Sequence, residues 1–325
     1  MSELTLPDAP AERTAPGAFK YALKIAFVLA VLTLAGFLLY RTLSRYSYDE
    51  IVAAMTAIPG SRIALAMLFA GLSYLCLTGF DGLATRYIGK TLPYPSVALT
   101  SFCSLSLGHN IGLAALSSGA VRYRFYSRKG VSAGDVARII VFCGFTVAMG
   151  LLTLGALVNI GRADLAGEIT GLGRGGAIAL GLGCLAAVAI YLAIATFVRR
   201  PLRIRNWTYR PPSVRLALGQ CLIGSLNFAC VSACLYHALA AVGDISYVAV
   251  VTVYVLAIVA SLLTHVPGGL GVIETVVLHL LPGAKVIGAL VAFRVIYFLI
   301  PLVIGTSLFA LTEVLVRRRA ASERA

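Results

Sequence analysis

The segment between residues 108 and 128 places several polar side chains inside an otherwise apolar stretch. It reads GHNIGLAALSSGAVRYRFYSR, and His109 and Asn110 stand beside glycine at its start. Both side chains donate and accept hydrogen bonds, and Gly and Asn tolerate the backbone angles of a broken helix. We predict that His109 and Asn110 lie at a helix break and bind a polar headgroup. The alternative is two packing residues hydrogen-bonded within the membrane.

The end of the same segment could bind phosphate. Arg122, Tyr123 and Arg124 are consecutive, and Tyr126 and Arg128 follow closely. Guanidinium groups bind phosphate through paired donors, and tyrosine rings favour the headgroup zone of a bilayer. We predict that Arg122 and Arg124 bind a lipid phosphate, with Tyr123 beside them. For this loop alone, the alternative is an ordinary positively charged loop with an aromatic belt.

A second polar group surrounds another apparent helix break. His265 precedes the run Pro-Gly-Gly, Glu274 follows it, and Arg294 lies in the next apolar stretch. A carboxylate in lipid is costly unless it is paired, so an intramembrane Glu274 indicates a functional site. Two interpretations remain open: Glu274 and Arg294 pair to hold the break in place, or they bind a headgroup together with His265.

The composition places these residues in a membrane protein. The chain has 325 residues, is 59% hydrophobic and 12% charged, and has a mean hydropathy of +0.92. Soluble domains are about half apolar and about a quarter charged. A net charge of +14 would indicate a nucleic-acid partner in a soluble protein, whereas here we expect the charges to lie beside the bilayer and predict no nucleic-acid binding.

The apolar stretches predict six spanning helices and two interrupted segments. A helix needs about 20 mainly apolar residues to cross the hydrocarbon core. The predicted spans are Tyr21 to Tyr40, Ile63 to Phe80, Val131 to Val158, Ala177 to Val198, Val214 to Val242 and Val286 to Val316. The interrupted segments are Ser96 to Ala120 and Ser246 to Pro282.

Positive charge orients these segments, because short cytoplasmic loops are enriched in Lys and Arg. Four stretches sum to +1, +4, +6 and +3 and account for the whole net charge: Asp81 to Pro95, Arg122 to Gly130, Arg199 to Arg215 and Arg317 to Ala325. If all four are cytoplasmic, the two interrupted segments are re-entrant hairpins, one entering from each side. Irregular backbone at membrane depth is tolerated where it lines a cavity.

The resulting topology is an inverted repeat. We predict an all-α polytopic membrane protein with pseudo-repeats at about residues 20–158 and 176–316 within one transmembrane domain, residues 20–316. Residues 1–19 are predicted to be a disordered cytoplasmic tail and residues 317–325 a basic cytoplasmic tail. Inverted repeats with broken helices are a recurrent transporter architecture. The alternative is eight full crossings.

The sequence contains no pattern for a cofactor or metal. The seven cysteines lie in apolar stretches without a CxxC pair, which indicates small buried residues. The segment GLGRGG fits a dinucleotide pattern formally, but no strand precedes it and a span follows. We predict no catalytic residue, no cofactor and no metal.

Two long motifs resemble a known family. GHNIGLAALSSGAVRYRFYSRKGVSAGDVARIIVFC and THVPGGLGVIETVVLHLLPG resemble the signature regions of the lysylphosphatidylglycerol synthase transmembrane family, the flippase-type domain of the multiple peptide resistance factor. The resemblance runs from about Tyr21 to Arg317. In two-domain members a soluble aminoacyl-transferase domain follows, and this chain ends without one.

The resemblance implies a phospholipid flippase of a bacterial inner membrane, with both termini cytoplasmic, that moves anionic or aminoacylated phospholipid. One alternative is a membrane platform for aminoacyl-phospholipid synthesis whose catalysis comes from a separate synthase chain. Another is a lipid-binding scaffold that transports nothing. The expected partners are phospholipids, and a homo-oligomer remains open.

Overall fold

The computed structural model describes residues 56–111, 114–198, 202–204, 207–264, 269–280 and 286–322, with residues 33, 49, 52 and 53 as isolated positions. The predicted tail 1–19, the predicted span Tyr21 to Tyr40 and His265 lie outside the described residues. The described chain is almost entirely helical, which confirms an all-α polytopic membrane protein.

The first half of the described chain contains α3 (Gly60–Tyr87), α4 (Tyr94–Ile111), α5 (Ala114–Tyr126), the 3-10 turn η1 (Ser127–Lys129), α6 (Ala133–Gly161) and α7 (Ala163–Thr170). The second half contains α8 (Gly173–Phe197), strands β1 (Leu202–Ile204) and β2 (Trp207–Tyr209), α9 (Val214–Leu239), α10 (Tyr247–Thr264), α11 (Val272–Leu280), α12 (Val286–Arg294), the π-helical turn η3 (Val295–Leu299) and α13 (Ile300–Ser322).

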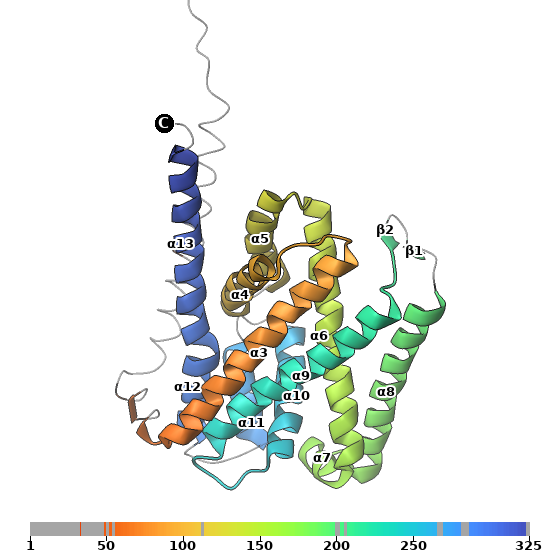
Figure 1. Ribbon diagram of the computed structural model, residues 1–325. Helices are drawn as coiled ribbons and strands as arrows, with labels where there is room; N and C mark the ends of the chain where they lie inside the picture. Colours follow the sequence, from red (N-terminus) through yellow and green to blue (C-terminus); the bar gives the residue numbers. More distant parts are fainter. Residues whose placement is uncertain are drawn as a thin grey trace, which may run out of the picture.

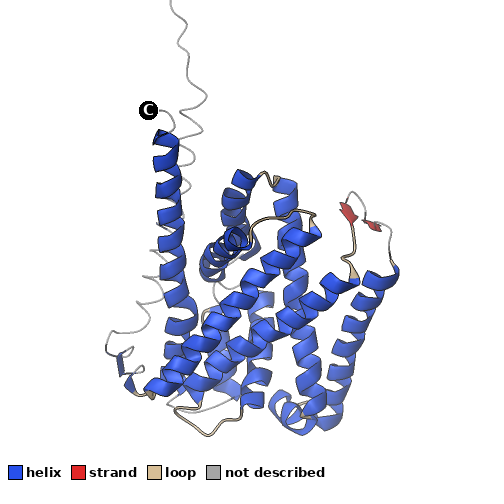
Figure 2. Cartoon of the chain, in the orientation of Figure 1, coloured by secondary structure: helices blue, strands red, loops and turns tan. Residues whose placement is uncertain are grey.

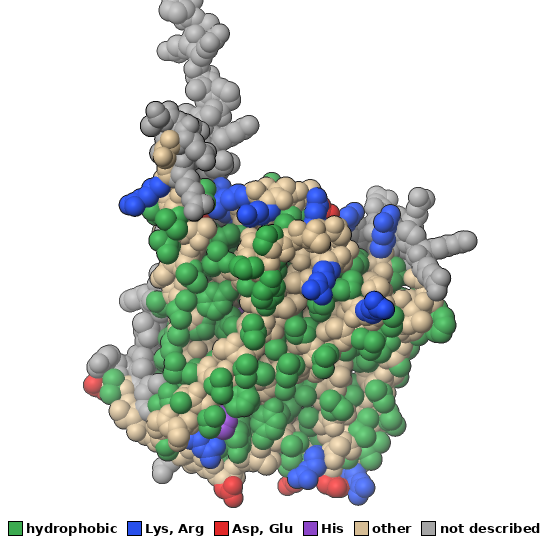
Figure 3. Space-filling model, viewed as in Figure 1, with side chains coloured by type: hydrophobic (Ala, Val, Ile, Leu, Met, Phe, Trp, Pro, Cys, Tyr) green, Lys and Arg blue, Asp and Glu red, His purple; other side chains and the backbone are tan. Residues whose placement is uncertain are grey.

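The helices run between two ends that differ in charge (Figure 1). At one end, which is uppermost in Figure 1, α3 ends, α6 begins, α8 ends and α9 begins, and α13 finishes there too. Lys and Arg side chains gather at this end, whereas the opposite end shows basic and acidic side chains together, with a broad apolar band between them (Figure 3). We call them the basic end and the opposite end.

Both interrupted segments return to the end from which they start. The α4–α5 pair, here hairpin 1, follows α3 and precedes α6, and both connections lie at the basic end. The α10–α11 pair, hairpin 2, follows α9 at the opposite end and leads into the α12–α13 span, which finishes at the basic end.

In hairpin 2, the described part of the second limb is too short for a full crossing. Its first limb α10 is long and apolar enough to span by itself. However, α11 has 9 residues and is about 14 Å long at 1.5 Å per residue, half of a hydrocarbon core of about 30 Å. The short second limb favours the two-hairpin topology over eight full crossings.

The order of elements is an inverted repeat. In the first half a span, hairpin 1 and a second span follow one another as α3, α4–α5 and α6. In the second half α9, hairpin 2 and α12–α13 repeat that order with every direction reversed (Figure 1). The span predicted at Tyr21 to Tyr40 would complete the first repeat as α8 completes the second, but it falls outside the described residues.

Small residues allow the central helices to pack closely. The backbones of α6 and α9 meet at Gly150 and Gly224, where a Cβ added to Gly150 would lie 2.3 Å from the carbonyl carbon of Gly224. Helices in lipid associate through this kind of close contact, because no hydrophobic effect drives them together. The oblique helices α3 and α9 pack against each other across the middle of the molecule (Figure 1), and both contribute to the main buried core.

Two details differ from the sequence-based prediction. The loop between α8 and α9 contains a small antiparallel hairpin, β1–β2, which appears in red in Figure 2. The last helix also continues to Ser322, so the residues from Arg317 onward that were predicted to form a tail extend α13 instead.

Candidate functional site

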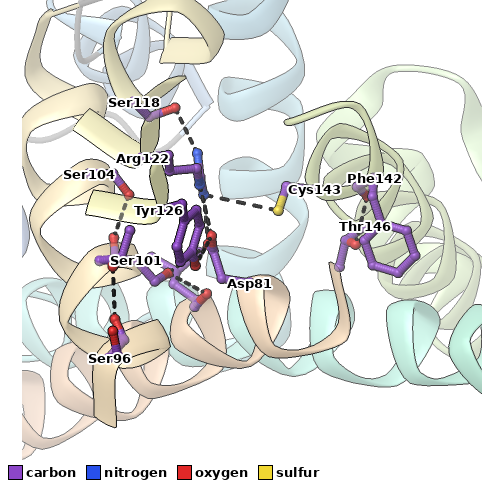
Figure 4. Close-up of polar contacts among 12 residues, drawn as sticks. Asp81, Ser96, Ser101, Ser104, Ser118, Arg122, Tyr126, Phe142, Cys143 and Thr146 are labelled. Atoms are coloured by element: carbon purple, nitrogen blue, oxygen red, sulfur yellow. Dashed lines mark hydrogen bonds and ion pairs between the residues drawn. The ribbon is translucent and has the colours of Figure 1, made fainter. Parts of the chain in front are cut away.

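Arg122 lies in a buried hydrogen-bond network inside hairpin 1 (Figure 4). Its Nε and Nη2 donate to the two carboxylate oxygens of Asp81 at 2.9 and 2.7 Å. The same carboxylate accepts hydrogen bonds from the hydroxyls of Tyr126 at 3.0 Å and Ser101 at 2.9 Å. Arg122 also donates to Ser118 Oγ at 2.8 Å. This network ties both limbs of hairpin 1 to α3.

This placement differs from the open phosphate-binding position expected for Arg122. The Arg122 side chain is 2% exposed and that of Asp81 is 0% exposed. A buried guanidinium in a two-bond contact with a carboxylate already has the partner that a phosphate would provide. In this structure Arg122 therefore holds hairpin 1 in place.

Arg124 has a different partner and a different environment. Its Nε and Nη2 donate to the two carboxylate oxygens of Glu313 on α13, at 3.1 and 2.7 Å. Arg128 on η1 contacts the same carboxylate. Glu313 is 3% exposed, whereas the side chains of Arg124 and Arg128 are 18% and 24% exposed. Two guanidinium groups converge here on one anion near the basic end.

The tip of hairpin 1 reaches the middle of the molecule. Asn110 is buried, and its Nδ2 donates to the backbone oxygens of Ser106 at 2.8 Å and Phe298 at 3.5 Å. The His109 ring lies 6.4 Å from the Tyr74 ring, centroid to centroid. The structure therefore places both residues at the end of the first limb, beside α3 and η3.

A polar group that the sequence analysis did not identify lies next to this tip. Ser73 Oγ is 2.7 Å from Asn227 Oδ1 and 2.9 Å from the hydroxyl of Tyr297. These three residues come from α3, α9 and the π turn η3, so the group joins the two repeats. π turns are rare and often occur at functional positions.

The second predicted group is assembled in hairpin 2. Arg294 Nε lies 2.5 Å from Glu274 Oε1, and its Nη2 donates to Oε2 at 2.9 Å and to the backbone oxygen of Gly269 at 2.9 Å. Glu274 also accepts a hydrogen bond from the backbone N–H of Gly271. Gly269 and Gly271 have φ angles of 59° and 85°, which only glycine adopts without strain. Arg294 therefore binds both the returning limb and the break itself.

Of the remaining predicted residues, only Tyr123 is described. Tyr123 is 49% exposed and faces outward from hairpin 1. His265 belongs to a part of the chain that is not described. Within the described residues, no three His, Cys, Asp or Glu side chains gather in a way that could hold a metal ion.

A separate pocket of about 360 Å³ lies between α6, α7 and α8 at the opposite end. Its charged side chains include Arg174 and Asp164, which are 3.6 Å apart and 69% and 79% exposed. An exposed pair of this kind contributes little to binding or stability. The buried and half-buried arginines of the hairpins are the stronger candidate site.

The comparison with known protein families agrees with this architecture. Residues 22–305 match the family described as the lysylphosphatidylglycerol synthase TM region. The chain belongs to this family. The match includes both hairpins, α3, α6 and α9, and it confirms the resemblance seen in the two sequence motifs.

Individual relatives fall into two groups. An uncharacterized protein of Synechocystis sp. is 34% identical, with 85% of this chain and 87% of the relative covered, and the inner membrane protein YbhN of Escherichia coli is 31% identical, with 78% and 81% covered. A phosphatidylglycerol lysyltransferase of Staphylococcus aureus is 23% identical over 87% of this chain but only 33% of its own length. The family domain is thus about a third of that enzyme.

Asp81 and Glu313 are the charged residues of the site that sequence reasoning missed. Asp81 was assigned to a cytoplasmic loop, whereas α3 continues past it to Tyr87 and buries it. Asp81 lies on the same face of α3 as buried Leu77 and Ala84. This helical spacing was the signal that could have identified Asp81 as buried. Helical spacing alone would pair Glu313 with Arg317 one turn away, whereas it pairs with Arg124 of hairpin 1 and Arg128 of η1.

Proposed function

We propose that this protein moves anionic or aminoacylated phospholipid between the leaflets of a bacterial inner membrane. The observation that carries the proposal is the pair of broken hairpins entering from opposite ends of an inverted repeat, each held by an arginine–carboxylate contact. Transporters repeatedly use this arrangement, in which the two halves rock about a site near the middle. The similarity of this chain to an inner membrane protein and to phosphatidylglycerol lysyltransferases supports a phospholipid as the substrate.

The charge distribution supports a cytoplasmic location for the basic end, and with it for both termini. Arg124 and Arg128 would then receive the lipid phosphate at the cytoplasmic side. They are the suitable pair because their side chains are partly exposed and already converge on an anion. Tyr123 would lie at the depth of the headgroups, where tyrosine is favoured.

Deeper in the protein, His109 and Asn110 would hydrogen-bond the headgroup at the tip of hairpin 1. From hairpin 2, Glu274 would attract a cationic amino group, with His265 as a further headgroup-binding residue. In this proposal Arg122 and Arg294 hold the hairpins rather than the ligand, because each guanidinium group is paired with a carboxylate and its side chain is only 2% exposed.

Leaflet exchange in proteoliposomes tests the proposal. Purified protein would be reconstituted with fluorescent phosphatidylglycerol or lysylphosphatidylglycerol, and an outside quencher would report how fast the inner lipids appear outside. We expect faster exchange than in empty liposomes. The Arg124→Gln, Arg128→Gln double variant should lose at least about tenfold in rate, the equivalent of ~1.4 kcal/mol.

Arg138→Gln is the matched control for this experiment. Arg138 lies near the basic end, pairs with Asp135 on its own helix at 3.2 Å, and is 64% exposed. Its variant removes one positive charge without touching either hairpin, so exchange should remain at the wild-type rate. Wild-type exchange equal to that of empty liposomes for both lipids would refute the proposed function.

A second candidate is a membrane platform for aminoacyl-phospholipid synthesis, with catalysis in a separate chain. The match to a domain that makes up 33% of a phosphatidylglycerol lysyltransferase favours it. Deletion of the gene distinguishes the two functions. Loss of lipid modification, and co-purification of a transferase, would support the platform, whereas unchanged modification with altered leaflet distribution would support the flippase.

A further inference from the structure

The contact of Arg124 and Arg128 with Glu313 joins the two repeats. Both arginines belong to the hairpin 1 region of the first repeat, and Glu313 belongs to α13, the last helix of the second. By contrast, Arg122 with Asp81 and Arg294 with Glu274 each connect elements of one repeat. Any motion of one repeat against the other at this end must therefore stretch or break the Glu313 contact.

A small hydrophobic cluster lies between the same elements. Its buried members are Cys103, Leu107, Val121, Phe125, Leu302 and Phe309, and it is separate from the main core. The Phe125 and Phe309 rings lie 5.8 Å apart, and α13 approaches α4 closely where Gly305 meets Ser106. We call this interface the seam. None of its buried members belongs to the main core.

We propose that Glu313 occupies, in this structure, the site at which Arg124 and Arg128 bind a lipid phosphodiester, so that lipid binding displaces Glu313 and opens the seam. This inference rests on the proposed function, because the phosphodiester belongs to the lipid that the flippase would carry. A carboxylate and a phosphodiester each carry one negative charge on a pair of oxygens, and each matches a guanidinium fork.

Exposure sets the direction of exchange. The two arginines are reachable from the basic end, whereas Glu313 is almost completely buried. A phosphodiester can therefore reach the arginines first. The displaced carboxylate cannot stay buried without a partner, because an unpaired buried charge is strongly destabilising. Glu313 must move into water, and α13 must move with it, which couples headgroup binding to opening of the seam.

A distance measurement combined with a binding titration tests the inference. The full chain would carry spin labels, attached through unnatural amino acids, at the exposed positions Ser127 and Leu315, in a phosphate-free maltoside detergent. We expect short-chain phosphatidylglycerol to lengthen the distance in the wild type. Glu313→Gln should show the longer distance without lipid and bind the lipid about tenfold more tightly, and the Arg124→Gln, Arg128→Gln double variant should not respond.

Asp135→Asn is the matched control, because Asp135 is a carboxylate near the same end that pairs with Arg138 of its own helix. It should behave as the wild type. An arm with inorganic phosphate distinguishes the two sources of the anion: an equal response would overturn a lipid site in favour of a free-phosphate site. A wild-type distance that stays constant at saturating lipid would also overturn the inference, whether or not Glu313→Gln folds.

The proposed function and this inference can fail separately. If the wild type exchanges lipid between leaflets but the distance across the seam does not change with lipid, the flippase function is supported and the proposed role of Glu313 is refuted. A responsive seam without leaflet exchange would leave a lipid-binding site and remove transport. Glu313→Asp, which keeps the charge on a shorter side chain, should fall between the wild type and Glu313→Gln in both distance and affinity.

Discussion

Hairpin 1 and hairpin 2 use the same pair of chemical groups in different ways. Each is held by an arginine that makes two bonds to a carboxylate. In hairpin 1 the Arg122–Asp81 pair is completely enclosed and is completed by two hydroxyl donors. In hairpin 2 the carboxylate, Glu274, is 15% exposed, and the partners that complete the pair are backbone groups of the break itself.

The two arginine–carboxylate pairs therefore have different structural roles. The bonds of Arg122 end on a neighbouring helix of the same repeat, so they position the hairpin as a whole. The bonds of Arg294 end on the irregular backbone between α10 and α11, so they set the shape of the break. Among the described residues, only the hairpin 1 region has in addition a contact with the other repeat that includes partly exposed arginines, at Glu313. From these differences we rank the loss of stability expected for each substitution, from the largest to the smallest.

The largest effect is expected for Asp81→Asn. The substitution leaves the Arg122 guanidinium buried without its counter-ion, and the loss of one partner of a buried pair costs about 3–5 kcal/mol of unfolding free energy. Thermal unfolding in detergent would measure this loss directly. A variant as stable as the wild type would show that Arg122 finds another anion or water. The Arg122–Asp81 pair would then matter no more for stability than the Arg294–Glu274 pair.

A double substitution sharpens this prediction. Replacing the pair by apolar residues, as in Asp81→Leu with Arg122→Met, removes both charges together and should restore much of the stability, since buried ion pairs often stabilise no more than well-packed apolar residues. Recovery would show that the single variant suffered from an unpaired charge rather than from altered packing.

A smaller effect is expected for Glu274→Gln. Glu274 is partly exposed, and Arg294 keeps its bond to the Gly269 carbonyl, so we expect a loss of about 2 kcal/mol. The loss should be local. Hydrogen exchange should rise in α11 while α3 and α9 remain protected. Equal exchange throughout the molecule would show instead that hairpin 2 is as integral to the core as hairpin 1.

Much of this architecture follows from sequence because membranes restrict it strongly. The backbone must be satisfied internally, so apolar length predicts spans, and glycine and proline inside an apolar stretch predict breaks. Loop charge predicts orientation. The Glu274–Arg294 contact was foreseen as one of two interpretations, since a carboxylate and a guanidinium in neighbouring apolar stretches have few other partners.

The contacts of hairpin 1 required the structure. Asp81 directly follows an apolar run that ends at Phe80, and composition cannot distinguish a helix that continues from one that stops there. Arg124 and Glu313 are 189 residues apart in the chain, and their pairing depends on how α13 packs beside hairpin 1. Helical spacing alone points from Glu313 to Arg317, one turn away on the same helix, and not to Arg124.

The smallest loss of stability is expected for Glu313→Gln. The carboxylate is buried, but both arginines are partly exposed and can turn towards water once it is neutralised, so we expect at most about 1 kcal/mol, as for exposed ion pairs. The stability of the wild type should also fall slightly with added salt, which screens partly exposed pairs more than fully buried ones, and Glu313→Gln should lose that part of the salt response. Unfolding measured at two salt concentrations checks both statements. If Glu313→Gln destabilised the protein as much as Asp81→Asn, the contact between the repeats would be as important for the fold as the Arg122–Asp81 pair. The two hairpins would then differ only in their partners.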